Sequence, residues 1–166
     1  MRTGSEPVSE LAQVIEKYKE TVYGLALSHL GGRAEADDVF QEVFLLYHTK
    51  APSFDSEAAR KAWLVRTTLN LCKKHNFSIW NTRVEKDPDA GRDVAVSFGS
   101  REENEVWAAV MTLESKYRIP VYLFYFEEMS SREIAKVLGV TEAAVLKRLS
   151  RARKKLRMIL EGDRFG

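Results

Sequence analysis

The stretch from residue 130 to 157, SSREIAKVLGVTEAAVLKRLSRARKKLR, is the feature that most constrains the fold of this chain. Either serine at its start can cap a short helix, and Glu133 is placed to stabilise the positive N-terminal end of that helix. Gly139 permits a sharp bend, and Thr141 can cap a second helix immediately after it. The pattern therefore predicts a helix-turn-helix.

The second predicted helix divides into an apolar side and a cationic side. Its apolar residues recur every three or four positions and form the expected core stripe: Val145, Leu149, Ala152, Leu156 and Leu160. The opposite side carries Ala143, Lys147, Ser150, Arg151 and Lys154, flanked by Arg148 and Arg153. A helix with one packed and one cationic side fits the major groove of B-DNA. The bland alternative is a solvated helix whose cations only keep the protein soluble, but the two caps and the glycine turn favour DNA binding.

Charge is segregated along a chain whose net charge is only +2. Residues 141–157 hold seven Lys or Arg and one Glu, whereas residues 33–47 hold four Asp or Glu and one Arg. An acidic helix and a basic helix in one chain predict two different kinds of partner. The single cysteine and the absence of an apolar signal segment in MRTGSEPVSE lead us to expect a cytoplasmic protein.

Helical spacing of apolar residues dominates the chain, and no segment alternates long enough to predict a sheet. We expect an all-α fold of two small domains, residues 1–80 and 102–166, joined by a flexible linker at 81–101 that contains Pro88, Gly91, Gly99 and many charges. The expected helices cover about 11–30, 34–48, 57–76, 102–113, 120–129, 131–138 and 141–160, with Pro120 in the first turn of its helix. The expected inner stripe of the third helix is Ala58, Ala62, Val65, Leu69 and Cys72.

Catalytic and metal-binding patterns are weak in this sequence. Cys72 and His75 form a C-x-x-H pair, but a zinc site normally needs four ligands and no second pair is present. No nucleophile motif, phosphate-binding loop or pair of carboxylates stands out. We therefore expect no metal, no cofactor, no small-molecule substrate and no enzymatic activity.

Two segments together point to a known family. The segment YRIPVYLFYFEEMSSREIAKVLGVTEAAVLKRLSRARKKLR resembles the C-terminal promoter-binding domain of extracytoplasmic-function (ECF) sigma factors. The segments EADDVFQEVFLLYH and KAWLVRTTLN resemble the N-terminal domain of the same family, in the expected order. The resemblance implies a bacterial initiation subunit that binds core RNA polymerase, recognises promoter DNA at two elements and helps to melt it. It also implies a possible anti-sigma partner.

The resemblance assigns roles to three groups of residues. The contact with the clamp coiled coil of core polymerase would include Asp38, Gln41 and Glu42, which share one helix face and can pair with arginines. The flap of the polymerase is a further expected partner. The minus-ten side would use Trp63, Thr67, Asn70 and Lys74, with the loop Ser53, Phe54, Asp55, Ser56 and Glu57 receiving an extruded base. For Trp63, packing between helices is an equally good interpretation. The minus-thirty-five element would be contacted by Leu146, Lys147, Ser150, Arg151 and Lys154, with Arg148 and Arg153 on phosphates or in structural contacts.

Two positions depart from the family pattern. Leu146 stands where the family often has a basic or polar residue, which predicts altered base readout there. The segment FSIWNTR is less basic than the arginine-rich stretch common after the third helix, so Lys73, Lys74 and His75 are expected to share the backbone contact.

Two other classes of function are compatible with parts of the sequence. A stand-alone helix-turn-helix regulator would bind its operator without polymerase, often as a dimer. An interaction module that mimics a sigma factor would bind partners without directing transcription. The acidic face at 38–42 and the polar stripe from Trp63 to Lys74 favour the sigma factor, because a simple regulator needs neither.

Overall fold

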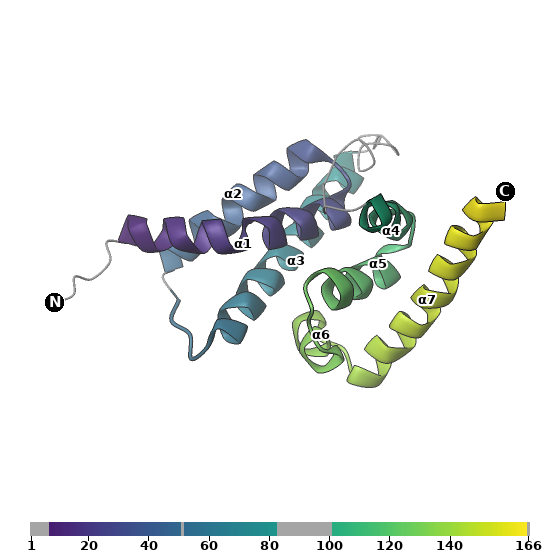
Figure 1. The fold of residues 1–166 in the computed structure, drawn as a ribbon. Helices are drawn as coiled ribbons and strands as arrows, with labels where there is room; N and C mark the ends of the chain where they lie inside the picture. The colour runs from purple at the N-terminus through teal and green to yellow at the C-terminus, as the bar shows by residue number, and fades with distance from the viewer. Residues whose placement is uncertain (1–6, 51, 83–100, 166) are drawn as a thin grey trace. The chain divides into compact units, whose positions relative to one another are not determined.

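The computed structural model describes residues 7–50, 52–82 and 101–165, and within them the side chains of 10–50, 52–75 and 105–162. Throughout these ranges the regular structure is helical and no strand is present, which confirms the predicted all-α class (Figure 1). The backbone divides into two compact units, Met1–Lys86 and Asp87–Gly166. This division falls inside the linker predicted at 81–101, of which 83–100 lie outside the described residues.

The N-terminal unit is a bundle of three helices, α1 (Pro7–Leu30), α2 (Arg33–Lys50) and α3 (Glu57–Thr82). Each helix packs against the other two. Apolar side chains spaced three or four residues apart on each helix meet in the centre and are removed from water, which is the main stabilising term. The largest fully buried side chains of this core are those of Val22, Leu25, Leu27, Val39, Val43, Leu64 and Val65.

The third helix differs from its prediction in length and in its buried face. It continues to Thr82, beyond the predicted end near Asn76, because the sequence between them contains no Gly or Pro to stop it. Ala58 is exposed rather than buried, while Leu64 and Leu71 join the core. The buried face is wider than one stripe because α3 packs against both α1 and α2.

The C-terminal unit contains α4 (Arg101–Met111), α5 (Ser115–Val121), the π-helical segment η1 (Tyr122–Phe126), α6 (Ser131–Leu138) and α7 (Glu142–Phe165). The long helix α7 packs against α4, α5 and α6. Its predicted stripe is buried at its N-terminal half and half-buried at Leu156 and Leu160. The core of this unit includes Val110, Val121, Leu123, Ile134, Val145, Leu149 and Ala152.

The predicted helix start at Pro120 is wrong. Helix α5 already begins at Ser115, and Pro120 lies inside it as a buried residue. Proline fits helical φ but lacks the N–H that would bond the carbonyl four residues earlier. The chain stays helical and continues into the wider π turn, where the Glu127 amide donates to the Tyr122 carbonyl at 3.3 Å.

The predicted helix-turn-helix is confirmed in its caps and its turn. The Glu133 amide donates to Ser130 Oγ at 3.1 Å, and the Ser130 amide donates to Glu133 Oε1 at 2.9 Å, which forms a capping box at the start of α6. Gly139 ends α6 in the left-handed region, with φ +70°. The Ala144 amide donates to Thr141 Oγ1 at 3.1 Å and so caps α7.

Replacing Gly139 with alanine is expected to destabilise the C-terminal unit by about 1–2 kcal/mol, because an L-residue is strained at this φ. A Cβ there would meet no atom within 4 Å, so the cost is conformational rather than steric.

Gly162→Ala in α7 is the matched control, since a Cβ at Gly162 would also meet no atom within 4 Å. It should be neutral or stabilise the helix by up to about 1 kcal/mol. Hydrogen exchange of the buried amides of α6 and α7 measures both. Equal effects of the two variants would contradict the assigned turn.

In the described part of the chain, none of the helices combines the length and the apolar character that crossing a lipid bilayer requires.

Candidate nucleic-acid interface

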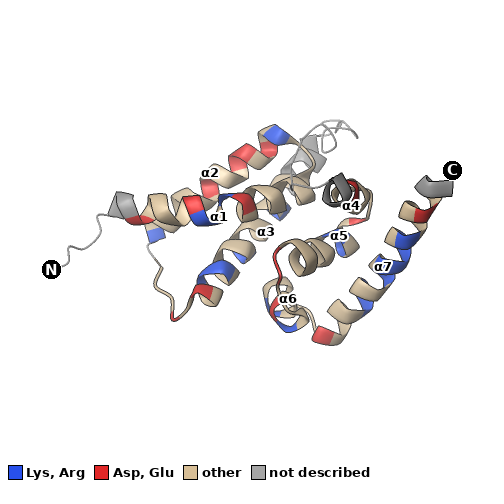
Figure 2. Ribbon diagram, viewed as in Figure 1, with Lys and Arg blue, Asp and Glu red and all other residues tan. Residues whose placement is uncertain are grey.

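Helix α7 carries a row of Lys and Arg residues along its length, as Figure 2 shows. The side chains of Lys147, Arg151 and Lys154 are exposed, while Val145 and Leu149 on the opposite side are fully buried. Ala143, Leu146 and Ser150 are also exposed, and Arg148 is half-buried. The helix therefore offers cations, a hydroxyl and small apolar groups on one side, the combination that reads base edges and phosphates in a DNA groove.

Arg153 makes a structural contact, one of the two roles that the sequence leaves open for it. Its Nε donates to the hydroxyl of Tyr125 at 2.8 Å, and its guanidinium lies 5.9 Å from the centre of the Phe124 ring. Lys155 is similarly placed over the ring of Tyr117, at 5.4 Å. Sequence reasoning missed these aromatic partners, because Tyr125 lies 28 residues before Arg153 and Tyr117 lies still farther from Lys155 along the chain. The two cations hold α7 to η1 and α5.

The acidic side of α2 is exposed at Asp38 and Gln41 and partly exposed at Glu42. The Oε1 of Glu42 lies 4.0 Å from Nε2 of His75 on α3, so this carboxylate is less free to meet a partner than Asp38 is. Sequence reasoning missed Leu45, which is 63% exposed and follows Gln41 by four residues on the same side. The signal available was its position in phase with Asp38 and Gln41. Acidic and amide groups around an exposed leucine form a surface suited to a protein partner.

The predicted polar stripe on α3 changes from half-buried to exposed along the helix. Trp63 and Thr67 are half-buried, whereas Asn70 and Lys74 are exposed. The ring of Trp63 meets the edges of two other rings, with centroids 5.8 Å from Tyr47 and 6.3 Å from Phe54. Trp63 therefore packs between helices, and Asn70 and Lys74 are the freely accessible members of the stripe.

The loop before α3 is anchored by the same aromatic cluster. Phe54 stacks on Tyr47 with centroids 6.3 Å apart, and the guanidinium of Arg60 lies 5.4 Å from the centre of the Phe54 ring. Arg60 Nε also donates to the Tyr47 hydroxyl at 3.2 Å. Ser56 Oγ accepts a hydrogen bond from the Ala59 amide at 3.1 Å and caps α3. Within the described structure, Ser53 and Asp55 are the loop residues that are exposed and have no such contact.

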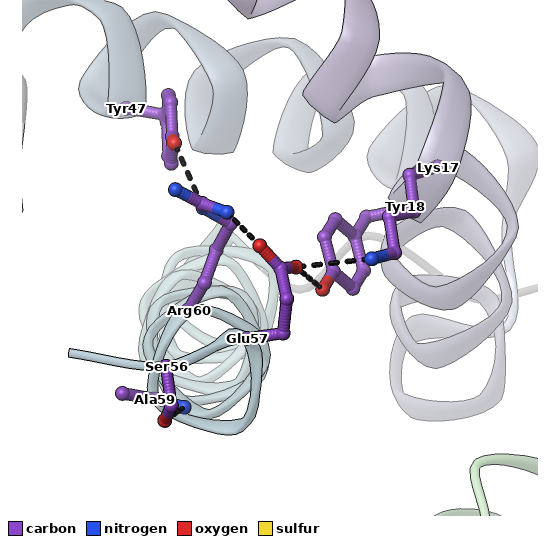
Figure 3. A network of polar contacts seen from close by, with 7 residues as sticks. All are labelled: Lys17, Tyr18, Tyr47, Ser56, Glu57, Ala59 and Arg60. Carbon is purple, nitrogen blue, oxygen red and sulfur yellow. Dashed lines mark hydrogen bonds and ion pairs between the residues drawn. The ribbon is translucent and has the colours of Figure 1, made fainter. Parts of the chain in front are cut away.

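Glu57 joins the start of α3 to α1 in the network that Figure 3 shows. Its carboxylate accepts from the Tyr18 hydroxyl at 2.5 Å and from Lys17 Nζ at 3.1 Å, and it pairs with Arg60. The hydrogen bond from Tyr18 lowers the pKa of Glu57, while burial and the carboxylate raise the pKa of Tyr18 to about 12. Glu57 is thus a helix residue with three partners, and the network fixes the C-terminal end of the loop 53–56.

Cys72 is fully buried in the N-terminal core, and burial raises the pKa of its thiol to about 12. A thiol in this state is a poor metal ligand and a poor nucleophile, since both roles need the thiolate. Among the residues with described positions, no three His, Cys, Asp or Glu side chains gather in a way that could hold a metal ion.

Comparison with known proteins places both units in one family. The family described as Sigma-70 region 2 matches residues 14–80, and the family described as Sigma-70, region 4 matches residues 103–156. The ECF RNA polymerase sigma factor SigW of Bacillus subtilis is 28% identical over 163 residues, covering 88% of this chain and 86% of SigW. The ECF RNA polymerase sigma factor SigM of Mycobacterium tuberculosis is 28% identical over 153 residues, covering 89% of this chain and 76% of SigM.

Solved structures agree with the sequence relatives. The sigma factor RpoE of Bartonella quintana, solved in complex with the anti-sigma factor NepR, has the same fold, with a TM-score of 0.72 at 21% identity over 92% of this chain and 97% of that one. CnrH, solved with the cytosolic domain of CnrY, has a TM-score of 0.64 at 26% identity over 92% and 88%. The two matched regions cover most of the chain in the order that the predicted domains require, and this chain belongs to the ECF group of the sigma-70 family of RNA polymerase sigma factors.

Proposed function

We propose that this sigma factor binds core RNA polymerase, directs it to promoters with two separated elements and helps to open the DNA between them. The observation that carries the proposal is the exposed cationic side of α7, which is the second helix of a helix-turn-helix whose helices both have capped N-termini. A helix held in this way can enter the major groove while its apolar side remains in the core. The minus-thirty-five contacts would come from Leu146, Lys147, Arg148, Ser150, Arg151 and Lys154.

The N-terminal unit would contact the minus-ten element and the melted strand. Asn70 can hydrogen-bond a base edge and Lys74 can neutralise a phosphate, since both side chains are exposed on α3. Thr67 would assist them. The cluster of Tyr47, Phe54 and Trp63 would support the loop at 53–56, whose exposed Ser53 and Asp55 would meet an extruded base. Opening the duplex then depends on binding energy supplied to single-stranded DNA, and the polymerase supplies the chemistry.

The polymerase contact would lie on the exposed side of α2. Asp38 and Gln41, with Glu42 beside them, can pair with arginines of the clamp coiled coil, and Leu45 adds apolar contact area. The flap would meet the C-terminal unit. An anti-sigma factor is a further proposed partner, since the similarly folded sigma factor RpoE was solved with the anti-sigma factor NepR.

Arg151→Ala tests the DNA face. A bidentate arginine–guanine contact contributes about 1–3 kcal/mol of base discrimination, so we expect a loss of roughly 10- to 100-fold in specific promoter binding by the holoenzyme. Core binding should stay unchanged. Arg157→Ala is the control, because Arg157 is also exposed on α7 but lies six residues, about 9 Å, farther from the N-terminal end of the helix. Titration of labelled promoter duplex at fixed salt measures both, and equal losses would contradict the assignment.

Retention on immobilised core polymerase separates this function from that of a stand-alone regulator. The sigma factor should be retained and should bind promoter duplex tightly only as holoenzyme. Absence of retention, combined with tight duplex binding by the free protein, would favour the regulator.

A further inference from the structure

A large apolar side chain, that of Leu146, lies among the cations of the proposed DNA face. Leu146 is 51% exposed, although its neighbour Val145 is fully buried, and the exposed residues near it include Lys147 and Ser150. It is the fifth residue of α7, close to the N-terminal end where a recognition helix meets base edges. An exposed leucine contributes to stability only when a partner removes it from water. Its position on this face therefore indicates which kind of partner covers it.

The surroundings of Leu146 favour DNA over a protein partner. Lys147 is exposed beside it, and Arg151 is exposed a little more than one turn farther along, so the leucine would approach its partner together with cations. Glu142, the first residue of α7, accepts a hydrogen bond from Ser131 Oγ at 2.7 Å, so its carboxylate is directed to α6. Lys147, Arg148 and Arg151 outnumber this one carboxylate, so the surface around Leu146 is net positive, as a surface that docks on phosphates requires.

We propose that Leu146 reads a thymine through its C5-methyl group in the minus-thirty-five element. This inference rests on the proposed function and names the base that one residue of the site recognises. A leucine side chain can neither donate nor accept a hydrogen bond, and among the four unmodified bases only thymine presents a methyl group in the major groove. The element should therefore contain an A·T pair that depends on Leu146.

Replacement of thymine by deoxyuridine tests this contact, because it removes the methyl group and keeps the base pairing. The element is first selected with holoenzyme, reconstituted from this chain and core polymerase, on a promoter library randomised across the minus-thirty-five element. Each thymine of the selected duplex is then replaced singly by deoxyuridine. At one position the wild-type holoenzyme should lose affinity by about fourfold, the loss expected for one buried methyl group. Leu146→Ala should bind the thymine duplex more weakly and be insensitive to the replacement at that position.

Met158→Ala is the matched control, because Met158 is also an exposed apolar residue of α7 but lies twelve residues nearer the C-terminus. It should keep the full wild-type response to deoxyuridine. A selected element without an A·T pair, a wild-type holoenzyme indifferent to every replacement, or a Leu146→Ala holoenzyme with unchanged sensitivity would each overturn the inference while specific promoter binding persisted. Failure of the wild-type holoenzyme to select any element would overturn the proposed function as well.

Discussion

Replacing Leu149 with alanine is expected to destabilise the C-terminal unit by about 3 kcal/mol, within the 2–5 kcal/mol typical of buried leucines. Leu149 is 0% exposed and packs in the stripe with Val145 and Ala152, so the change leaves a cavity where α7 meets the rest of the unit. The free energy of unfolding of a small domain is only a few kcal/mol, so a large fraction of the molecules should have this unit unfolded at about 37 °C. Hydrogen exchange of the α6 and α7 amides should accelerate, while that of α1–α3 stays as in the wild type.

Leu146→Ala provides the comparison for this effect on the same helix. The chemical change is identical, but Leu146 is half-exposed, so its loss should change the free energy of unfolding by no more than about 1 kcal/mol. The two substitutions should therefore affect different quantities: Leu149→Ala should lower the stability of the unit, and Leu146→Ala should weaken DNA binding. If Leu149→Ala left the exchange of α7 unchanged, the assignment of the buried side of α7 would be wrong.

Reversing the charge of Asp38 to lysine is expected to weaken binding to core polymerase by about 2 kcal/mol or more, which is roughly 30-fold. Asp38 is exposed on the side of α2 that also carries Gln41 and Leu45, so a lysine there would face the cations proposed on the partner. Glu42→Ala should also reduce binding, but by less, since Glu42 is near His75 and only partly exposed. A binding titration of labelled sigma factor with core polymerase at fixed salt measures these losses.

Glu16→Lys is the charge-matched control for Asp38→Lys. Glu16 lies on α1 and pairs at 3.0 Å with Lys19 in an exposed contact, which contributes little to stability. Its reversal should leave core binding close to the wild-type value at the same salt concentration. Equal weakening by the two reversals would indicate a general electrostatic attraction rather than a contact on α2.

The helix-turn-helix could be predicted from sequence because its determinants are local. The capping box of Ser130 and Glu133, the left-handed Gly139 and the Thr141 cap each act within a few residues, and the structure has all of them. The exposed side of α7 and the buried stripe opposite it follow from helical periodicity in the same way.

The parts that sequence reasoning missed depend on contacts between distant residues. Nothing near Glu57 in the sequence announces its bond to Tyr18, 39 residues earlier, and nothing near Arg153 announces Tyr125. The packing of Trp63 could be settled only when Tyr47 and Phe54 were seen beside it. The helix start predicted at Pro120 was wrong for the opposite reason. The local preference of proline for the first turn of a helix was overridden by tertiary packing, which buries Pro120 inside α5.

Transcription reconstituted with purified core polymerase on a library of randomised promoters tests the central claim most directly. The account predicts that this chain selects templates with a shared pair of separated elements and starts transcription at a fixed distance from them. It further predicts that Arg151→Ala relaxes selection at the upstream element, whereas Asp38→Lys lowers transcription from every template alike. Transcripts whose templates share no element, or none at all although core polymerase retains the chain, would contradict it.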